Sequence, residues 1–378
     1  MTIELNATTL TATSKSESRS KLPHLQIGNL DIGFPVVQAA LSGYSDWPMR
    51  MLARELGASY SLCEVMLDQF LVAMKDRAKN RHYLFNSAEE QPVAGQLMGA
   101  EPEQFAQGAK RLVEAGFAVI DINFGCPVKK VLGRCRGGFH LSQPETALEI
   151  VKRTRDIVPT EIPVTVKMRR GLDDTVESRD NFYEIFEGAF AAGVAAATVH
   201  GRTVVQRYKG PSRWAFLADL KREFPHCTIL GSGDLFTPRD CLRMMAETGV
   251  DGVTVARGAI GNPWIFKQCR ALAAGLPLPE PPSVHEQRQI LERHWLLAEQ
   301  LYGPIKTGPL LRKFGIKYAA SHPRHLEIRP LFTSVRSSAD WMAILDHWYR
   351  DDLAGVFPSP EIHHVQGSSC SDYWSPNT

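Results

Sequence analysis

The chain lacks the features that mark several large classes of protein. None of its seven cysteines is spaced as a CxxC pair, so neither a zinc ribbon nor a disulfide framework is indicated. No stretch approaches the roughly 18 to 20 consecutive apolar residues of a membrane span. The formal net charge is only +2, so nucleic-acid binding would require a local basic patch. We therefore expect reduced thiols, no metal site and no membrane association.

Both ends of the chain differ from its middle in composition. Residues 1–22 are polar, rich in Ser and Thr, and without the apolar stretch of a signal peptide, so we expect a disordered tail and a cytoplasmic protein. Residues 356–378 indicate a second loose tail. Between these tails the patterns described next predict two domains, at 23–280 and 285–355, in a chain that we expect to be a monomer.

From about residue 35, short apolar runs rich in β-branched residues alternate with longer amphipathic segments. Eight of the runs are candidate strands, which begin at Pro35, Ser59, Pro92, Ala118, Pro163, Ala195, Cys227 and Asp251. The segments between most of them have helical spacing, as at 102–116, 144–158 and 237–249. Alternation of strands and helices predicts a parallel sheet.

Eight such units predict a closed (β/α)8 TIM barrel, an α/β fold. No G-x-G-x-x-G fingerprint lies in the early turns, which disfavours an open doubly wound sheet, although the pattern alone keeps that sheet as the alternative. In a barrel the chemistry lies at the C-terminal ends of the strands. The residues at these ends are mostly polar: Leu41, Ser42, Glu64, Gln96, Asn123, Cys126, Lys167, Arg169, His200, Arg202, Ser232, Gly233, Arg257 and Gly258.

A Pro-rich linker at 273–283 separates the barrel from a region with helical patterns only, which predicts a small all-helical C-terminal domain. Basic residues are spaced among apolar ones in the middle of this domain: Arg312, Lys313, Lys317, Arg324 and Arg329. A solvated helix face and a surface for an acidic partner both fit this pattern.

The ends of the seventh and eighth runs are rich in glycine, with GSGD at 231–234 and ARGAIGNP at 256–263. At this place TIM barrels bind phosphate through exposed N–H groups and a charged partner, for which the candidates are Gly231, Gly233, Gly258 and Arg257. Tight turns explain the glycines equally well. Three strand-end side chains suit the edge of an electron-rich heterocycle, namely Gln96, Lys167 and His200. Together these residues predict a site for flavin mononucleotide (FMN).

Seven segments resemble, in order and spacing, the signatures of the tRNA-dihydrouridine synthase family: QAALSGYSDWPMR, QLMGA, DINFGCPVKKV, VKMRRG, TVHGRT, GSGDL and VARGAIGNPWIF. The resemblance runs from about Leu25 to at least Phe266, and YGPIKTGPLLRKF is similar to the helical domain of the bacterial B-type members. It implies an FMN-binding barrel and a helical tRNA-binding domain. Such an enzyme reduces specific uridines of tRNA to 5,6-dihydrouridine with NADPH as electron donor.

The resemblance also implies that Cys126, in the family's G-C-P motif, is the catalytic acid. Reducing the C5–C6 double bond of uracil needs a hydride on one carbon and a proton on its neighbour, and a reduced flavin supplies only the hydride. A thiol, with an ordinary pKa of about 8.5, is mostly protonated at neutral pH yet yields its proton readily. A buried, inert cysteine at a strand end is the structural alternative.

Other roles follow from matching positions in the family. The implied flavin contacts are Leu41, Gln96, Lys167, His200, Ser232, Gly233, Asp234, Arg257 and Gly258. The implied contacts to the flipped uridine and its phosphate are Asn123, Arg169 and Arg202. A polyanion must be gripped on both sides of a base that leaves its stack. The cations expected to do so are Lys129, Lys130, Arg134 and Arg136 in the loop after Cys126, and Arg312, Lys313 and Lys317 in the helical domain.

The chain departs from the family pattern in three segments. Ala39-Ala40-Leu41 replaces Ala-Pro-Met beside the expected flavin, and Ser232 replaces an asparagine of longer reach. Phe139 and His140 stand where small residues are usual. Because Cys126, Lys167 and His200 are retained, we expect these changes to affect FMN affinity or the choice of uridine more than the reaction.

Two other functions stay open on the sequence. A small-molecule flavin barrel of the dihydroorotate or dihydropyrimidine dehydrogenase type would share the phosphate loops and an Asn with a catalytic Ser or Cys. Such an enzyme has no use for a basic helical domain. A tRNA-binding protein with weak or lost catalysis is the second alternative, and flavin absorbance of the purified protein would argue against it.

Overall fold

The computed structural model describes residues 22–75, 77 and 80–359. The expected tails therefore lie outside the described residues, apart from Leu22 and 356–359. In the described part, eight parallel strands form a closed ring in which β3 pairs with both β4 and β11, and β4 also pairs with β6. This confirms the TIM barrel and excludes the open sheet. The strands are β3 (Val36–Gln38), β4 (Ser61–Leu62), β6 (Val93–Met98), β7 (Val119–Phe124), β8 (Val164–Arg169), β9 (Ala196–His200), β10 (Ile229–Ser232) and β11 (Gly252–Val255).

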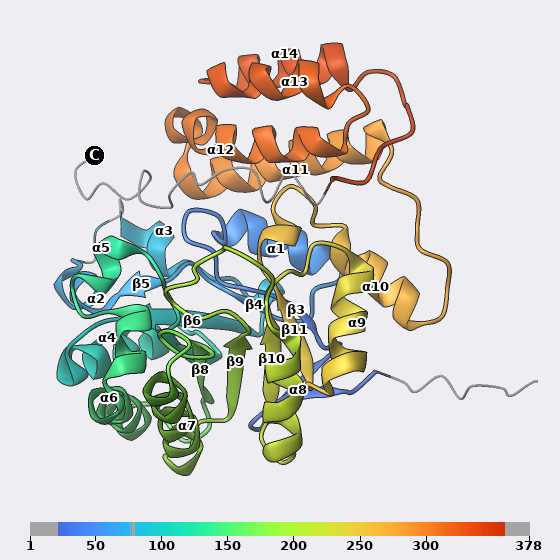
Figure 1. Ribbon diagram of the computed structural model, residues 1–378. Helices are drawn as coiled ribbons and strands as arrows, with labels where there is room; N and C mark the ends of the chain where they lie inside the picture. Colours follow the sequence, from blue (N-terminus) through green and yellow to red (C-terminus); the bar gives the residue numbers. More distant parts are fainter. Residues whose placement is uncertain (1–21, 76, 78–79, 360–378) are drawn as a thin grey trace, which may run out of the picture.

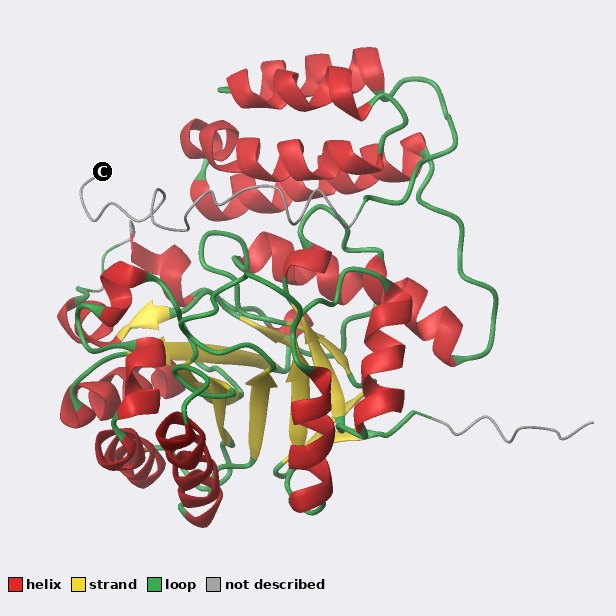
Figure 2. Ribbon diagram, viewed as in Figure 1, coloured by secondary structure: helices red, strands yellow, loops and turns green. Residues whose placement is uncertain are grey.

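Helices surround the strands on the outside of the barrel (Figures 1 and 2). They are α1 (Trp47–Glu55), α2 (Asp68–Ala73), α3 (Arg81–Leu84), α4 (Pro102–Glu114), α5 (Lys129–Leu132), α6 (Pro144–Ile157), α7 (Val176–Ala191), α8 (Trp214–Glu223), α9 (Pro238–Thr248) and α10 (Ile265–Ala273). Their ends follow local sequence signals. Thr237 and Asp240 form a capping box at the start of α9, and Gly249 ends that helix at a φ of +72°.

Successive side chains of each strand point alternately toward the helices and into the barrel, so residues of the two kinds of position differ in polarity. On β8, Val164, Val166 and Met168 face the helices in the main hydrophobic core, whereas Thr165 and Lys167 occupy the other set of positions. The inward-facing residues nearest the strand beginnings form a separate apolar cluster that includes Val37, Tyr60, Leu62, Ala94, Val119, Ala196 and Leu230. Further along the strands the inward positions become polar. The interior of the barrel is therefore apolar at its N-terminal end and polar at its C-terminal mouth.

An antiparallel hairpin of β1 (Leu25–Ile27) and β2 (Leu30–Gly33), which the sequence did not predict, covers the N-terminal end of the barrel. Leu25 and Ile27 are fully buried in the inner apolar cluster. At the turn, Gly28 has a φ of +59°, and a Cβ there would lie 3.3 Å from both Pro163 and Ala195, where two barrel strands begin. A short strand, β5 (Met66–Leu67), adds to the C-terminal part of β6.

The C-terminal region consists of four helices: α11 (Val284–Tyr302), α12 (Pro304–Tyr318), α13 (His325–Leu331) and α14 (Ser338–Trp348). They lie beyond the C-terminal ends of the strands, in orange and red in Figure 1. Arg293 on α11 forms a 2.7 Å ion pair with Glu55 on α1, and the Tyr302 hydroxyl donates to Asp46 at 2.9 Å. These contacts fix the all-helical region beside the mouth of the barrel.

Candidate active site at the barrel mouth

A buried hydrogen-bond chain joins β6, β7 and β8 inside the mouth. The Gln96 amide donates to the Asp121 carboxylate at 2.7 Å, and the Thr165 hydroxyl donates to the other oxygen of that carboxylate at 2.6 Å. Burial raises the pKa of Asp121, while the two donors and the Lys167 charge act in the opposite direction. The Asn123 amide donates to the side-chain oxygen of Gln96 at 2.8 Å, so the orientation of both amides is fixed.

Asn123 also shapes the turn that carries Cys126. Its side-chain oxygen accepts hydrogen bonds from the N–H groups of Gly125, at 3.0 Å, and Cys126, at 3.1 Å. On the other side, the Gly138 N–H donates to the Cys126 carbonyl at 3.1 Å. Gly137 has a φ of +60°, and a Cβ there would lie only 2.8 Å from the Cβ of Cys126. The partly exposed thiol is therefore presented by a backbone that is held on both sides.

Lys167 lies directly opposite Asn123 on the neighbouring strand β8. Burial and the nearby Arg169 charge lower the pKa of Lys167 to about 8, against an opposing effect of Asp121. Within the described residues, its amine makes neither a hydrogen bond nor an ion pair. A cation with a lowered pKa and no partner in the fold is suited to a polar or anionic ligand at the mouth.

His200 ends β9 with its ring in a defined state. Its Nδ1 atom accepts a hydrogen bond from the N–H of Arg202 at 3.1 Å, which assigns the ring proton to Nε2. Burial lowers the pKa of His200 well below its ordinary value, and the charges of Arg169, Lys167, Arg202 and Arg257 add to this effect. His200 is consequently a neutral hydrogen-bond donor through Nε2.

The end of β10 is tied to β9 by an ion pair. Arg202, whose side chain is 1% exposed, donates to both carboxylate oxygens of Asp234 at 2.8 and 2.7 Å and to the Gly210 carbonyl. Asp234 has a φ of +59°, and its carboxylate also accepts the Ser212 N–H at 2.7 Å. One buried guanidinium nitrogen of Arg202, Nη1, has no partner among the described residues.

The remaining expected flavin contacts also lie at strand ends. Arg257 is partly exposed, and its guanidinium carbon is 5.0 Å from the ring centroids of both Tyr208 and Phe236. A Cβ at Gly258 would lie 2.2 Å from the Leu235 carbonyl oxygen, so only glycine permits this approach. Leu41 is half-buried in a loop after β3, where its N–H donates to the Ser45 hydroxyl at 2.8 Å. Ser232 is buried at the end of β10, followed by Gly233 at a φ of +113°.

The hydrogen-bond donors and charges of these groups match those that a bound flavin requires. One polar mouth is surrounded by a lysine and an arginine nitrogen that have no partner among residues 22–75, 77 and 80–359, by a neutral histidine donor and by an oriented amide. A ring system with several acceptors on one edge and a phosphate on its side chain would engage such a set of donors. The sequence predicted their convergence because parallel strands of a barrel all end at the same rim.

The structure places the expected RNA-contacting arginines deep within the site. Arg169 is 3% exposed and donates to the carbonyls of Gly125, Thr203 and Arg207 at 3.0, 2.8 and 2.7 Å. Burial lowers the pKa of Arg169 to about 10. Arg169 and Arg202 thus hold backbone segments of the mouth, and a direct contact with a substrate stays a prediction.

The loop after Cys126 carries cations of two kinds. Lys129, Lys130 and Arg134 are exposed, on and just after α5. Arg136 is 6% exposed and donates to the Gln69 side chain at 2.6 Å. The exposed three are therefore available to a polyanion, whereas Arg136 stabilises the fold.

Arg312, Lys313 and Lys317 of the helical domain were expected to contact RNA, but Lys313 and Lys317 lie next to the barrel. Lys313 is half-buried, with its amine 5.3 Å from the Tyr44 ring centroid. Burial raises the pKa values of Asp46 and Glu64, and the Lys313 charge opposes this rise. The Lys317 backbone packs against Gly261 in the loop after β11. Arg312 donates to the Val335 carbonyl at 2.5 Å, inside the helical region. Two of these three residues therefore lie between the helical region and the barrel.

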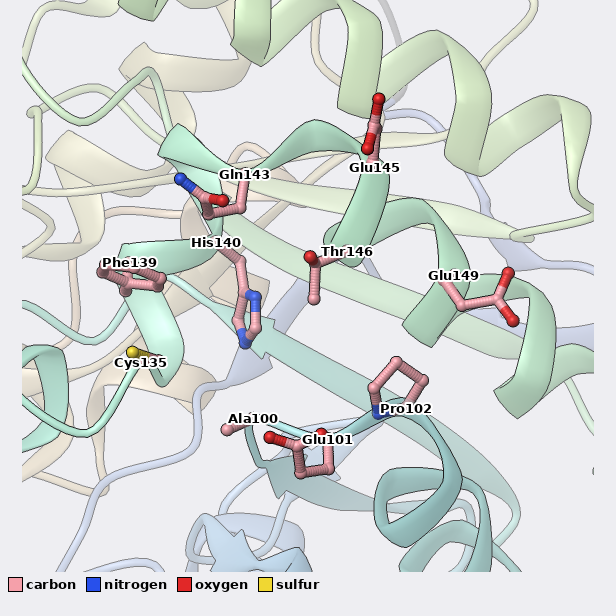
Figure 3. A pocket seen from close by; sticks show the side chains of 10 residues that line it. All are labelled: Ala100, Glu101, Pro102, Cys135, Phe139, His140, Gln143, Glu145, Thr146 and Glu149. Carbon is pink, nitrogen blue, oxygen red and sulfur yellow. The ribbon is translucent and has the colours of Figure 1, made fainter.

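His140 and Phe139 line a separate cavity of about 470 Å³, shown in Figure 3. The His140 ring is buried, and its Nε2 atom lies 2.9 Å from the Gly99 carbonyl. Burial also lowers the pKa of His140. The short helix η3 (Gly137–Ser142) thus packs against Cys126 with its glycines and lines this cavity with its larger side chains. His140 is therefore fixed to the segment that follows β6.

The described residues contain neither a cluster of metal ligands nor a membrane-spanning helix. No group of three or more His, Cys, Asp and Glu side chains in 22–75, 77 and 80–359 is placed to hold a metal ion. Among the helices of the same ranges, none combines the length and apolar character needed to cross a membrane.

The family model that matches this chain and two of its relatives are all described as dihydrouridine synthases. The family model described as "Dihydrouridine synthase (Dus)" matches residues 37–350. A "Probable tRNA-dihydrouridine synthase" of Mycobacterium tuberculosis (strain CDC 1551 / Oshkosh) is 33% identical over 348 residues, which cover 90% of this chain and 87% of that protein. A "tRNA-dihydrouridine synthase B" of Xanthomonas axonopodis pv. citri (strain 306) is 31% identical over 336 residues, with 89% and 98% covered.

Two solved structures share the fold at a TM-score of 0.51. One is a 2-naphthoyl-CoA reductase complex, at 12% identity over 68% of this chain and 52% of that one. The other is histamine dehydrogenase from Rhizobium sp. 4-9, at 14% identity over 74% of this chain and 51% of that one. This chain thus spans about half the length of each, and at this identity the likeness supports the barrel fold alone.

Proposed function

Since the chain belongs to the dihydrouridine synthase family, we propose that it reduces specific uridines of tRNA to 5,6-dihydrouridine, with FMN as bound cofactor and NADPH as electron donor. The observation that carries this proposal is the mouth of the barrel. There Asn123 holds the turn that presents the Cys126 thiol, and Lys167 lies opposite Asn123 on the next strand. The mouth thus combines a proton donor with hydrogen-bond donors that suit a flavin ring, and flavin-dependent reduction of uracil would need both.

In this proposal different side chains bind the flavin, donate the proton and orient the uracil. Lys167, His200 and Gln96 would hold the polar edge of the flavin, while Ser232, Gly233, Gly258 and Arg257 would hold its phosphate and side chain, beside Leu41 and Asp234. When bound, the flavin supplies the hydride. Cys126 would donate a proton to the carbon next to the one that receives the hydride. Asn123 would orient the uracil, and Arg169 and Arg202 would keep the surrounding backbone in place.

The tRNA would be held by cations around this mouth, because a uridine reaches the site only after it leaves its stack. Exposed Lys129 and Lys130 lie on α5, directly after the turn that carries Cys126. Lys313 and Lys317 lie on the opposite side, where α12 meets the barrel, and Arg312 is on the same helix. A near-neutral chain would thus bind RNA through a local cluster of cations.

The test is mass spectrometry of nucleosides from an unmodified tRNA that has been incubated with the purified protein and NADPH. We expect a gain of two hydrogens on uridine and a yellow protein with flavin absorbance. A yellow protein that leaves tRNA unmodified would favour a small-molecule flavin dehydrogenase. A colourless protein that binds tRNA would favour an RNA-binding function without catalysis.

Three finer expectations from the sequence also stay predictions. The preference for NADPH is tested by repeating the assay with NADH. The monomeric state is tested by sedimentation of the purified protein. The cytoplasmic location also stays a prediction, which fractionation of cells would test.

A further inference from the structure

The cavity in Figure 3 lies between the first turns of α4 and α6 and has no role in the proposed reaction. Its walls come from the segment after β6, from η3 and from the start of α6. These residues all differ from those assigned above to flavin, uridine or tRNA. Phe139 and His140 stand where the chain departs from the family pattern, so residues outside the shared motifs shape the cavity.

His140 contributes a buried hydrogen-bond acceptor without a partner. Its Nε2 atom, 2.9 Å from the Gly99 carbonyl, carries the ring proton, because a carbonyl oxygen can only accept. Nδ1 is therefore an acceptor, and it makes no hydrogen bond within residues 22–75, 77 and 80–359, although His140 is only 1% exposed. In Figure 3 one ring nitrogen lies toward Ala100 and the other toward Thr146, across the cavity. A buried acceptor without a donor costs free energy, which a ligand with an N–H group would recover.

The charged side chains that line the cavity are all acidic: Glu101, Glu145 and Glu149. Glu149 pairs with Arg153 at 2.7 Å, whereas Glu101 and Glu145 are exposed and have no ion pair in the part of the chain that the structure describes. The N-termini of α4 and α6 oppose these charges, each with about half a positive elementary charge. Two unpaired carboxylates exceed these two half charges, so the cavity attracts a cation.

The cavity suits an organic cation better than a metal ion. No three His, Cys, Asp or Glu side chains among the described residues are placed to hold a metal. A volume of about 470 Å³ is also within the range of small-molecule sites. Phe139 and Pro102 give its walls apolar surface beside the acceptor and the carboxylates. An aliphatic ammonium compound combines N–H donors and positive charge with an apolar chain, and so matches all three features.

We propose that this cavity binds a small aliphatic compound of the polyamine class. One terminal ammonium donates to Nδ1 of His140, and a second ammonium lies near Glu101 and Glu145. The inference goes beyond the proposed function and does not depend on it. Because η3 lines the cavity and the Gly138 N–H of η3 donates to the Cys126 carbonyl at 3.1 Å, a bound ligand also stabilises the segment that holds the Cys126 turn.

The experiment is a calorimetric titration of the full-length protein with spermidine, without RNA. His140→Phe keeps an aromatic ring but removes the acceptor, and should weaken binding roughly 10- to 150-fold. Combined Glu101→Gln and Glu145→Gln should weaken it about 2- to 30-fold and reduce its dependence on salt. Combined Glu223→Gln and Glu247→Gln removes two exposed carboxylates, on α8 and α9, and as the matched control should leave the affinity unchanged.

Hydrogen–deuterium exchange of the wild-type protein provides a second measurement at the site itself. Spermidine should slow amide exchange in η3, because a ligand stabilises the segment that it contacts. Exchange in α9 is the internal control and should stay the same, since α9 does not line the cavity.

Thermal unfolding without ligand shows whether a variant has lost the site or the fold. If His140→Phe is unstable, the glutamate variant and the exchange measurement decide the outcome. Absence of spermidine binding to the wild-type protein, or binding that leaves exchange in η3 unchanged, would overturn the proposal. Equal affinities of the wild type and the Glu101/Glu145 variant at low salt would also overturn it. None of these results depends on dihydrouridine formation, which is measured separately with tRNA and NADPH.

Discussion

The side-chain oxygen of Asn123 accepts a hydrogen bond from the backbone N–H of Cys126 at 3.1 Å. This contact spans three residues of one turn, but its orientation depends on Gln96 of the neighbouring strand, which accepts from the Asn123 amide at 2.8 Å. The position of the thiol is therefore fixed by a chain of contacts that begins at the buried Asp121 carboxylate. Each link is a target for substitution.

Asn123→Ala should reduce kcat by roughly 10- to 100-fold while the protein keeps its flavin, because the Cys126 turn loses its acceptor and small displacements of a reacting group are costly. Steady-state kinetics and flavin absorbance would measure the two effects. Asn29→Ala is the matched control, since Asn29 is exposed in the hairpin turn at the other end of the barrel. Unchanged kcat in Asn123→Ala would exclude a positioning role for this residue.

Cys126→Ala should keep the yellow colour and tRNA binding but lose about 10²- to 10⁴-fold in turnover, since it removes the proposed proton donor. Dihydrouridine formation would be followed by nucleoside mass spectrometry. Cys135 lies in the same loop, is exposed and provides the control through Cys135→Ala. Turnover of Cys126→Ala at the wild-type rate would contradict the assigned role.

Asp234→Ala should lower the free energy of unfolding by roughly 2 to 4 kcal/mol, because Arg202 is almost fully buried and would lose the carboxylate that pairs with its charge and accepts two of its hydrogen bonds. Denaturant unfolding would measure this change. Asp219→Ala removes the exposed ion pair with Arg222 and should cost less than about 1 kcal/mol. Equal effects of the two substitutions would show that burial of Arg202 does not matter.

Glu64 should make stability fall as pH rises from about 4.5 to 7. Burial and the nearby Asp46 charge raise the pKa of Glu64 to about 7, so over this interval the folded state binds a proton that the unfolded state has lost. At about 1.4 kcal/mol per pKa unit the loss of stability is at most about 3.5 kcal/mol, and solvent access to the partly exposed side chain reduces it. Unfolding of Glu64→Gln at several pH values should lack this component, whereas exposed Glu187→Gln should retain it. Parallel pH profiles of the wild type and Glu64→Gln would refute this assignment.

Combined Lys313→Gln and Lys317→Gln should weaken tRNA affinity at low salt without loss of flavin absorbance, provided that these amines reach the RNA from where α12 meets the barrel. A filter-binding titration would measure the affinity. Lys306→Gln alters an exposed lysine in the first turn of α12 and serves as the control. Lower thermal stability with unchanged affinity would assign the two lysines to domain docking instead.

Much of the site could be predicted before any coordinates, because a closed parallel barrel brings every strand end to one rim. Gln96, Asn123, Lys167 and His200 lie at the ends of four consecutive strands, and the structure joins them at the mouth. Their inward direction also follows from alternation along each strand. The pattern of strands and helices was thus sufficient for the fold and for the polar rim.

The partners of charged side chains could not be predicted in this way. Arg169 and Arg202 were expected to meet RNA, but both donate to backbone carbonyls of the loop after β9, Arg169 to Arg207 and Arg202 to Gly210. The same loop exposes Tyr208, which no local sequence pattern singled out.

The sequence by itself therefore determined the barrel, the helical region and the ring of polar strand ends, since these depend on local periodicity and on the geometry of parallel strands. Only the tertiary structure decided which cation faces solvent and which is buried. Arg136 contacts Gln69 and Lys313 approaches Tyr44, although 67 and 269 positions separate the two members of these pairs along the chain. Such contacts depend on how distant segments pack, and no local pattern of residues encodes that distance.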